Sequence, residues 1–317
     1  MRISANVAIG PDGPQTHDEI AGEVADVARH GLAGAWWPQL PPVEGTAAWD
    51  PLVSIAATAA LAPGIELGVA VALAQLQHPL RLAAQALTVQ AVSGNRLTLG
   101  LGVGHAPIVE GVYGVSHRSP VRDLARTLEV LVPALRGDPV PAGAAPAIVQ
   151  VPGARPPSLL LAALGPRMLE LAGRWADGTV TTWAGPRALA THVVPRLTAA
   201  AAAAGRPAPR VVANVLATVT ADAEGARRRA AERFGLAGQL PSYRAMLDLD
   251  GRSGPADALV AGDEDEVASA LAELVDAGAT EVLVSVVGPP TDRARTLALL
   301  GELSRAARAS RSDAPGR

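Results

Sequence analysis

Residues 94–105, GNRLTLGLGVGH, contain an apolar run at residues 96–101 that is typical of a buried β-strand. Glycines then alternate at Gly100, Gly102 and Gly104 before His105. A dinucleotide-binding fingerprint would need a further glycine where His105 stands, and a helix that begins at once. The sequence meets neither condition. The stretch therefore favours the exit of a barrel strand over the first turn of a Rossmann fold.

Strand and helix signals alternate on both sides of this stretch. The predicted strands are residues 2–9, 32–36, 65–71, 96–101, 158–163, 178–182, 210–218 and 280–286. Helices are predicted at residues 16–30, from residue 50, and at 79–92, 120–135, 166–176, 186–204, 222–234, 263–277 and 291–308. This alternation predicts an α/β fold, a (β/α)8 TIM barrel, with an open Rossmann-like sheet as the alternative. We expect one barrel domain over residues 1–310, an inserted loop near 238–260 and a disordered tail at 311–317.

Composition excludes several classes of protein. The chain has 317 residues, a formal net charge of −3, 49% hydrophobic and 18% charged residues, which suits a sizeable core and argues against a nucleic-acid partner. Cysteine is absent and all 27 cationic side chains are arginine. Thiolate and Schiff-base lysine chemistry are therefore excluded, and no spacing of His or acidic residues indicates a metal site.

No segment indicates export or membrane insertion. Residues 1–7 alternate in polarity instead of forming a signal peptide, and apolar runs such as Leu67–Ala74 are broken well before the roughly 20 residues that span a bilayer. We expect a cytoplasmic protein whose partner is a small-molecule substrate.

Active sites of such barrels lie at the C-terminal ends of the strands. Trp36, Trp37 and Gln39 follow the second predicted strand, and His105 follows the fourth. The indoles of Trp36 and Trp37 would either line the mouth for a planar ligand or fill the top of the barrel. An imidazole titrates near neutral pH, so His105 is the candidate acid–base residue.

The tripeptide Gly-Pro-Arg occurs at residues 165–167 and again at 185–187, each time between a predicted strand and a predicted helix. Free amide groups, the helix dipole and a guanidinium would converge there on an anion. We expect one of the two to bind an anion, although proline is also ordinary at the first position of a helix.

Several motifs together resemble a known family. They are QHPL at 77–80, AAQALT at 83–88, GNRLTLGLG at 94–102, EGVYG at 110–114 with Arg122 and Glu129, AALGPRM at 162–168 leading to ADG at 176–178, and LPSYRAML at 240–247. Their order resembles the luciferase-like flavin and deazaflavin oxidoreductases, in particular the branch that depends on coenzyme F420. The resemblance covers nearly the whole chain.

This resemblance implies a barrel that binds the deazaflavin at its C-terminal mouth, and a homodimer. It places a non-prolyl cis peptide at Ala70–Val71 behind the ring, and strand-exit residues along it. The residues it assigns to the cofactor are Ala70, Val71, Gly102, Val103, Gly104, Leu164, Gly165, Pro166, Arg167 and Thr182, with residues 165–167 receiving the phosphate tail. Trp183 joins Trp36, Trp37 and Gln39 as a candidate for the substrate pocket.

The chain departs from the relatives that oxidise sugar phosphates. Those relatives carry an acid or a histidine at the second strand exit, a glutamate at the fourth, and lysines for the substrate phosphate, where this chain has Gln39, His105 and no lysine. We therefore expect a less polar substrate and hydride transfer to or from F420, with His105 as proton donor or acceptor. An FMN-dependent luciferase-like monooxygenase and a non-catalytic flavin-binding protein are the alternatives.

Overall fold

The computed structural model describes residues 1–7, 15–141 and 145–312, with side chains as far as residue 309. Eight parallel strands form a closed ring: β1 Ile3–Asn6, β2 Gly34–Trp37, β3 Glu66–Leu73, β4 Leu97–Gly102, β5 Ser158–Ala162, β6 Gly178–Thr182, β7 Arg210–Val219 and β9 Glu281–Val286. The pairings of β6 with β7 and of β9 with β1 and β7 complete the ring. The predicted (β/α)8 barrel is confirmed. The first predicted strand ends early, at Asn6, and residues 8–9 lie outside the described part of the chain.

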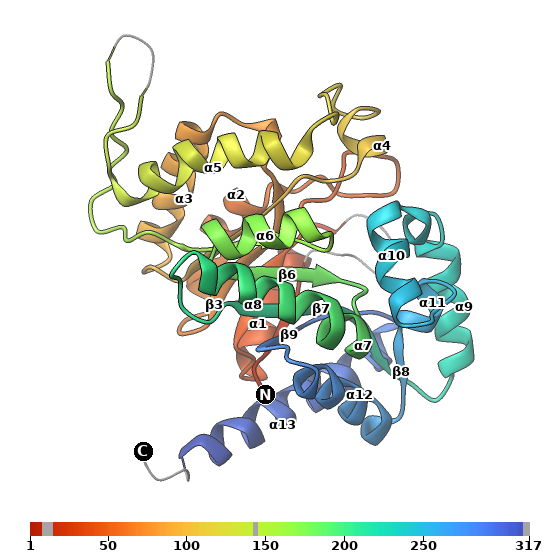
Figure 1. The fold of residues 1–317 in the computed structure, drawn as a ribbon. Helices are drawn as coiled ribbons and strands as arrows, with labels where there is room; N and C mark the ends of the chain where they lie inside the picture. The colour runs from red at the N-terminus through yellow and green to blue at the C-terminus, as the bar shows by residue number, and fades with distance from the viewer. Residues whose placement is uncertain (8–14, 142–144, 313–317) are drawn as a thin grey trace.

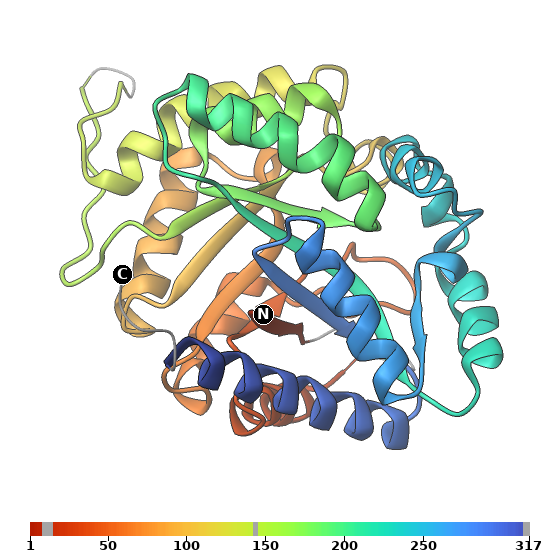
Figure 2. The same cartoon turned by 60° about the horizontal axis from the view of Figure 1, so that its bottom comes forward.

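Helices surround the strands (Figure 2). They are α1 His17–Arg29, α2 Pro51–Thr58, α3 Pro79–Val92, α5 Pro120–Arg136, α6 Pro166–Trp175, α8 Val194–Ala203, α9 Ala223–Phe234, α12 Glu264–Asp276 and α13 Pro290–Ser312. The predicted helix at 186–204 is divided into α7 Pro186–Ala188, a π-turn at Leu189–Val193 and α8. Within the described residues, no helix combines the length and apolar character needed to cross a bilayer.

The segment at residues 238–260, expected to be a loop, contains the helices α10 Pro241–Leu249 and α11 Pro255–Ala258. Its glycines and aspartates suggested a loop, but Met246 and Leu247 are buried and give α10 an apolar face that packs inward. A short strand, β8 Val260–Gly262, follows and pairs only with the C-terminal end of β7, outside the ring. The predicted tail at 311–317 begins within the last turn of α13, and residues 313–317 are outside the described part.

The N-terminal end of the barrel is closed by a cluster of charges. Arg210 contacts Glu66 at 3.0 Å and Glu281 at 2.8 Å, and Arg2 contacts the same two carboxylates at 2.6 and 2.9 Å. Burial alone would lower the pKa of Arg210, but the two carboxylates outweigh it and leave that pKa raised. Glu281 is fully buried, and the guanidiniums of Arg2 and Arg210 pair with its carboxylate.

The middle of the barrel is apolar. Trp36 packs there with Leu160, Val180, Val212 and Leu283. Gly68 makes room for its indole, because a Cβ at Gly68 would lie 2.1 Å from the ring. Trp37 is buried in the layer between the strands and the helices. Both indoles therefore serve packing, which favours a role in filling the barrel over a role in lining the mouth for a planar ligand.

The charge cluster predicts a large loss of stability on removal of its central cation. Arg210→Ala should lower the free energy of unfolding by about 3 kcal/mol, because Glu281 then stays buried with fewer partners. Arg295→Ala is the control, since its ion pair with Glu264 is exposed on both sides and should contribute at most about 1 kcal/mol. Urea unfolding of both variants would measure this, and equal losses would contradict the assignment.

Candidate active site

The C-terminal mouth of the barrel has a polar rim above the apolar middle layer. The amide of Asn6 donates to Asn214 at 3.0 Å and to Ser285 at 2.9 Å, and Ser285 donates to Asn214 at 3.2 Å. Asn214 also donates to Thr182 at 3.5 Å. The buried Oδ1 of Asn6 has no hydrogen-bond partner among the described residues. This rim offers polar groups to a molecule held in the mouth.

The opposite side of the mouth is built by the close approach of β3 and β4. Their register shifts between Val69 and Ala72, and the Ala70–Val71 peptide there is cis, as the family resemblance implied. A Cβ at Gly100 would lie 2.1 Å from the carbonyl oxygen of Val69, and one at Gly102 would lie 2.7 Å from the Val71 side chain. The alternating glycines are thus explained by the bulge of β3, since only glycine permits this approach.

This approach produces a small apolar floor. Ala70, Val71 and Ala162 are partly exposed and pack on top of the cluster around Trp36. Gly102 lies between Val71 and Ala162, so no side chain rises from β4 at this point. A floor of small side chains over a fully packed barrel suits the face of a flat ring.

Two glutamines hold the neighbouring strand exits in place. The side-chain oxygen of Gln39 accepts a hydrogen bond of 2.7 Å from the Leu73 amide, and Gln75 donates one of 2.6 Å to the Val103 carbonyl. Gln39 thus lies at the mouth, where we expected a substrate-pocket residue, and its oxygen is used to position β3. These bonds orient the backbone that leads to His105.

His105 lies directly after β4 at the N-terminus of the short helix α4 Ala106–Val109, and its side chain does not cap that helix. Burial lowers the pKa of its imidazole below the usual value, and the nearby charge of His117 lowers it further. The imidazole is therefore neutral at pH 7. A neutral imidazole at a strand exit can accept a proton from a reacting group.

The helix α10 covers the mouth above His105. The Tyr243 ring lies edge-on to His105 at 4.6 Å and to Trp183 at 4.7 Å between ring centroids. Burial raises the pKa of Tyr243, whose hydroxyl is hydrogen-bonded to Thr182. Trp183 has a φ of 55°, which is unusual outside glycine, and packs against Leu247 and Ala258. Thr182 and Trp183 thus contact Tyr243, whose ring lies between them and His105.

The two Gly-Pro-Arg tripeptides differ in what meets their free amides. At the start of α7 the carboxylate of Asp250 accepts from Gly185 at 2.6 Å, Arg187 at 3.0 Å and Ala188 at 3.1 Å. At the start of α6, Gly165 provides no side-chain cap, and residues 165–167 are exposed. The second site therefore already holds an anion of the chain, which leaves the first as the candidate for an external anion.

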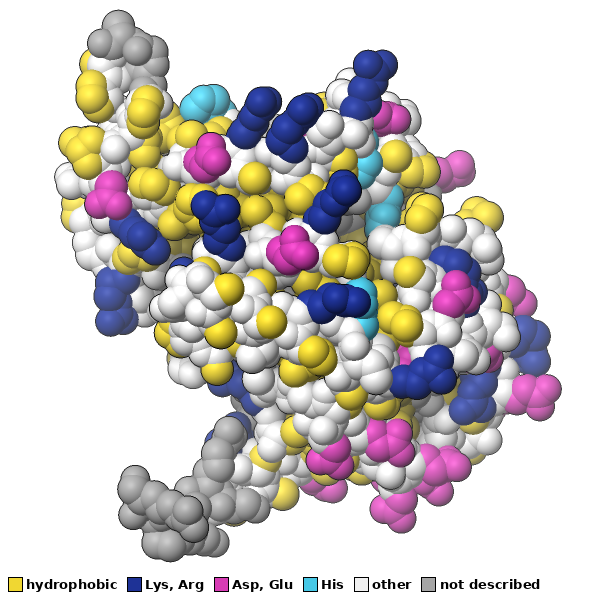
Figure 3. Space-filling view, viewed as in Figure 1, with side chains coloured by type: hydrophobic (Ala, Val, Ile, Leu, Met, Phe, Trp, Pro, Cys, Tyr) yellow, Lys and Arg dark blue, Asp and Glu magenta, His cyan; other side chains and the backbone are white. Residues whose placement is uncertain are grey.

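A cationic side chain, Arg196, is linked through His192 to the residue before the start of α6. His192 donates from Nε2 to the Leu164 carbonyl at 2.7 Å, because its Nδ1 accepts from Arg196 at 3.1 Å. Figure 3 shows arginine and histidine side chains, with acidic ones among them, over α5, α6 and α8, whereas acidic side chains gather over α12. This charge distribution favours an anionic group near Arg167.

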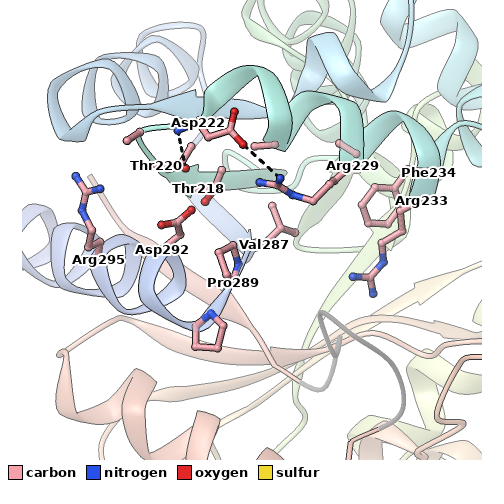
Figure 4. A pocket seen from close by; sticks show the side chains of 15 residues that line it. Thr218, Thr220, Asp222, Arg229, Arg233, Phe234, Val287, Pro289, Asp292 and Arg295 are labelled. Carbon is pink, nitrogen blue, oxygen red and sulfur yellow. Dashed lines mark hydrogen bonds and ion pairs between the residues drawn. The ribbon is translucent and has the colours of Figure 1, made fainter.

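A cavity of about 560 Å³ opens at the C-terminal ends of β7 and β9 (Figure 4). Its walls include Thr218 from β7, Arg229 and Phe234 from α9, and Asp292 from α13. Phe234 also lies 6.3 Å from Trp183 between ring centroids. Through Trp183 and Tyr243, a row of rings leads from this cavity to His105.

Several of these residues were not predicted as site residues from the sequence. Tyr243 lies inside the motif at 240–247, but the expectation of a loop there gave it no role. The rim residues Asn6, Asn214 and Ser285 and the capping residue Asp250 carry no local signal, since only the closed ring and the packing of α10 bring them to the mouth. No group of three or more acidic or histidine side chains in the described residues could hold a metal ion.

A closed (β/α)8 barrel with a bulged third strand and a mouth of this construction defines a luciferase-like fold. The family model for luciferase-like monooxygenases matches residues 3–281. The chain therefore belongs to the luciferase-like monooxygenase family, whose members are oxidoreductases.

Solved structures of two cofactor classes share this fold. An F420-dependent secondary alcohol dehydrogenase in complex with an F420–acetone adduct has a TM-score of 0.80 at 15% identity, over 97% of this chain and 99% of that one. The coenzyme F420-dependent tetrahydromethanopterin reductase of Methanopyrus kandleri has a TM-score of 0.72 at 21% identity, over 97% and 99%. The oxygenating constituent of 3,6-diketocamphane monooxygenase from Pseudomonas putida, in complex with FMN, has 0.73 at 16%, over 96% and 97%.

The role of Asp250 predicts a specific loss of stability. Asp250→Ala should lower the free energy of unfolding by about 1–2 kcal/mol, because three amides at the start of α7 lose their acceptor. Asp248→Ala, two residues away in an exposed pair with Arg244, should change it by at most about 0.5 kcal/mol. Urea unfolding measures both, and an effect of Asp250→Ala no larger than that of the control would contradict the capping role.

Proposed function

We propose that this protein is a coenzyme F420-dependent oxidoreductase that transfers a hydride between the deazaflavin C5 and a small organic substrate. The proposal rests on two features of the mouth. One is the apolar floor of Ala70, Val71 and Ala162, and the other is the exposed start of α6 at residues 165–167, which has no side-chain cap. The flat ring of the cofactor would match the floor, and its anionic tail would match the start of α6.

The residues at the mouth fit such a cofactor. Gly102, Val103 and Gly104 would lie along the edge of the ring, with Ala70 and Val71 behind it and Thr182 on the far side. Leu164, Gly165 and Arg167 would hold the phosphate with amide groups and a guanidinium, and Pro166, which has no amide hydrogen, would start α6 beside it. When bound there, the deazaflavin would supply the carbon that accepts or donates the hydride.

His105 would manage the proton that accompanies the hydride. When a substrate hydroxyl is oxidised, its carbon loses a hydride and its oxygen loses a proton, and a neutral imidazole beside the floor can accept that proton. In the reverse direction the protonated imidazole returns it. The lowered pKa of His105 favours the neutral, proton-accepting form at pH 7.

The substrate is expected to be small and weakly polar. Around His105 the mouth is lined by the rings of Tyr243 and Trp183 and by small apolar side chains of the floor. The chain has no lysine with which to bind a substrate phosphate. Among the similar structures, one holds an F420–acetone adduct, which is of this size class.

FMN-dependent monooxygenation is the alternative, supported by the FMN complex with the same fold. A side-by-side titration of the purified protein with F420 and with FMN separates the two. We expect saturable F420 binding that is tighter than FMN binding, with turnover insensitive to oxygen. Tighter FMN binding with oxygen consumption would support the alternative. Binding without turnover on a broad substrate panel would indicate a non-catalytic flavin-binding protein.

One Gly-Pro-Arg tripeptide is capped by Asp250 and the other has no side-chain cap, so arginine substitutions in the two should differ in their effect on cofactor binding. Arg167→Ala should weaken cofactor binding about tenfold, because a charge-assisted contact to the phosphate is lost. Arg187→Ala should leave binding unchanged, because Asp250 already occupies the start of α7. Fluorescence titration with F420 gives both dissociation constants, and equal effects would exclude the α6 site as the phosphate site.

The proton role predicts a pH-dependent defect. His105→Ala should lower kcat by about 10²-fold with nearly unchanged cofactor affinity. In the oxidative direction the wild-type rate should fall as the pH drops through the pKa of His105, below about 6.5, because the imidazole then becomes charged. This acid limb should vanish in His105→Ala and persist in His17→Ala, which changes an exposed histidine of α1. Unchanged turnover in His105→Ala would remove it from the mechanism.

A further inference from the structure

The helix α10 has no part in the proposed cofactor site, yet it places Tyr243 directly against the candidate acid–base residue. The two rings are edge-on, with centroids 4.6 Å apart and planes at 64°. On its other side the Tyr243 ring lies edge-on to Trp183 at 4.7 Å, and its hydroxyl is hydrogen-bonded to Thr182. Tyr243 thus links the exits of β4 and β6 across the mouth.

The His105 imidazole depends on such a contact for its orientation. Within the described part of the chain it has no side-chain hydrogen bond, and it does not cap α4. A catalytic histidine is ordinarily oriented by a hydrogen bond to one ring nitrogen. Here the ring of Tyr243 is the contact in place of that bond.

The backbone of α10 is held firmly enough for this purpose. Arg244, the next residue, donates to the Ser253 carbonyl at 2.7 Å, to the Arg252 carbonyl and to Asp248 at 2.9 Å. Leu247 is fully buried against Trp183 and Ala258. At the end of α10, Asp250 binds the start of α7. These contacts hold the helix that carries Tyr243 against the exit of β6 and the start of α7.

The distribution of aromatic residues supports a dedicated role. The chain contains one Phe, two Tyr and five Trp. Three of these eight, Phe234, Trp183 and Tyr243, form one row that ends at His105. In a chain so poor in aromatic residues, a row of rings along one wall of the mouth is more than general core packing requires.

We propose that Tyr243 is a positioning residue for His105: its ring holds the imidazole at the exit of β4 and shields it from water. The functional consequence rests on the proposed role of His105 in proton transfer. The positioning itself can be measured without cofactor or turnover, so an experiment can contradict the positioning by Tyr243 and the catalytic role of His105 independently.

The titratable groups that face His105 are few. Tyr243 faces it from α10, and His117 faces it from the loop before α5. The backbone amide of His117 donates to the Glu110 carboxylate at 2.9 Å, which holds that loop beside α4. Burial is the main cause of the lowered pKa of His105, with the charge of His117 second. Removal of the Tyr243 ring should therefore admit water and raise this pKa toward its usual value.

The test is an NMR titration of the His105 ring in the cofactor-free protein, in wild type and in Tyr243→Ala, Tyr243→Phe and Tyr113→Ala. Tyr243→Ala should raise the pKa of His105, and Tyr243→Phe should keep it near the wild-type value because the ring remains. Tyr113→Ala changes the other tyrosine and should have no effect. A pKa unchanged in Tyr243→Ala, shifted equally in Tyr113→Ala, or shifted in Tyr243→Phe as far as in Tyr243→Ala would overturn the proposal.

Kinetics with the holoenzyme provide a second measurement. Tyr243→Ala should lower kcat about tenfold and move the acid limb of the rate profile to higher pH, while Tyr243→Phe restores both. If Tyr243→Ala does not fold, Tyr243→Phe still decides the matter, because a loss of the lowered pKa in that variant contradicts the role of the ring. A silent His105→Ala with a shifted titration in Tyr243→Ala would refute the proposed catalytic role and retain the positioning.

Discussion

The packing of the Trp36 indole over Gly68 is the constraint on which the arrangement of the mouth depends. It fills the middle of the barrel, so the charged cluster below it and the polar rim above it remain separate layers. A smaller residue at position 36 would leave a large void under the floor, and a side chain at position 68 would displace the indole. Because the middle layer is solid, Ala70, Val71 and Ala162 form a floor and not the entrance to a channel.

The candidate site is enclosed by barrel strands on one side and by the helices that follow β7 on the other. The floor belongs to β3, β4 and β5, whose geometry is set by backbone hydrogen bonds and by close approach at glycine. The opposite wall belongs to the excursion that follows β7, in which α9, α10 and α11 lie together at the C-terminal end of the barrel (Figure 1). The floor and the opposite wall of the candidate site therefore come from different parts of the chain.

The two Gly-Pro-Arg helix starts differ in what meets their amide groups. Two helix starts with the same tripeptide offer the same amide groups and the same arginine. At α7 the carboxylate of Asp250 satisfies them, and this bond joins α10 to the barrel. At α6 no side chain of the N-cap does so, and cationic groups lie close by. Identical local sequences thus have a structural role in one place and a proposed binding role in the other.

The sequence by itself determined the barrel. Apolar alternation located its eight strands, because such signals depend on neighbouring residues alone. The family resemblance placed the cis peptide at Ala70–Val71, and the strand pattern placed His105 at a strand exit. Only the tertiary structure decided that Trp36 fills the barrel, that Glu281 and Arg210 form its charged base, that Asp250 caps α7, and that Tyr243 covers His105. These pairings join residues far apart in the chain, and no local pattern encodes which buried charge or ring meets which partner until the ring of strands has closed.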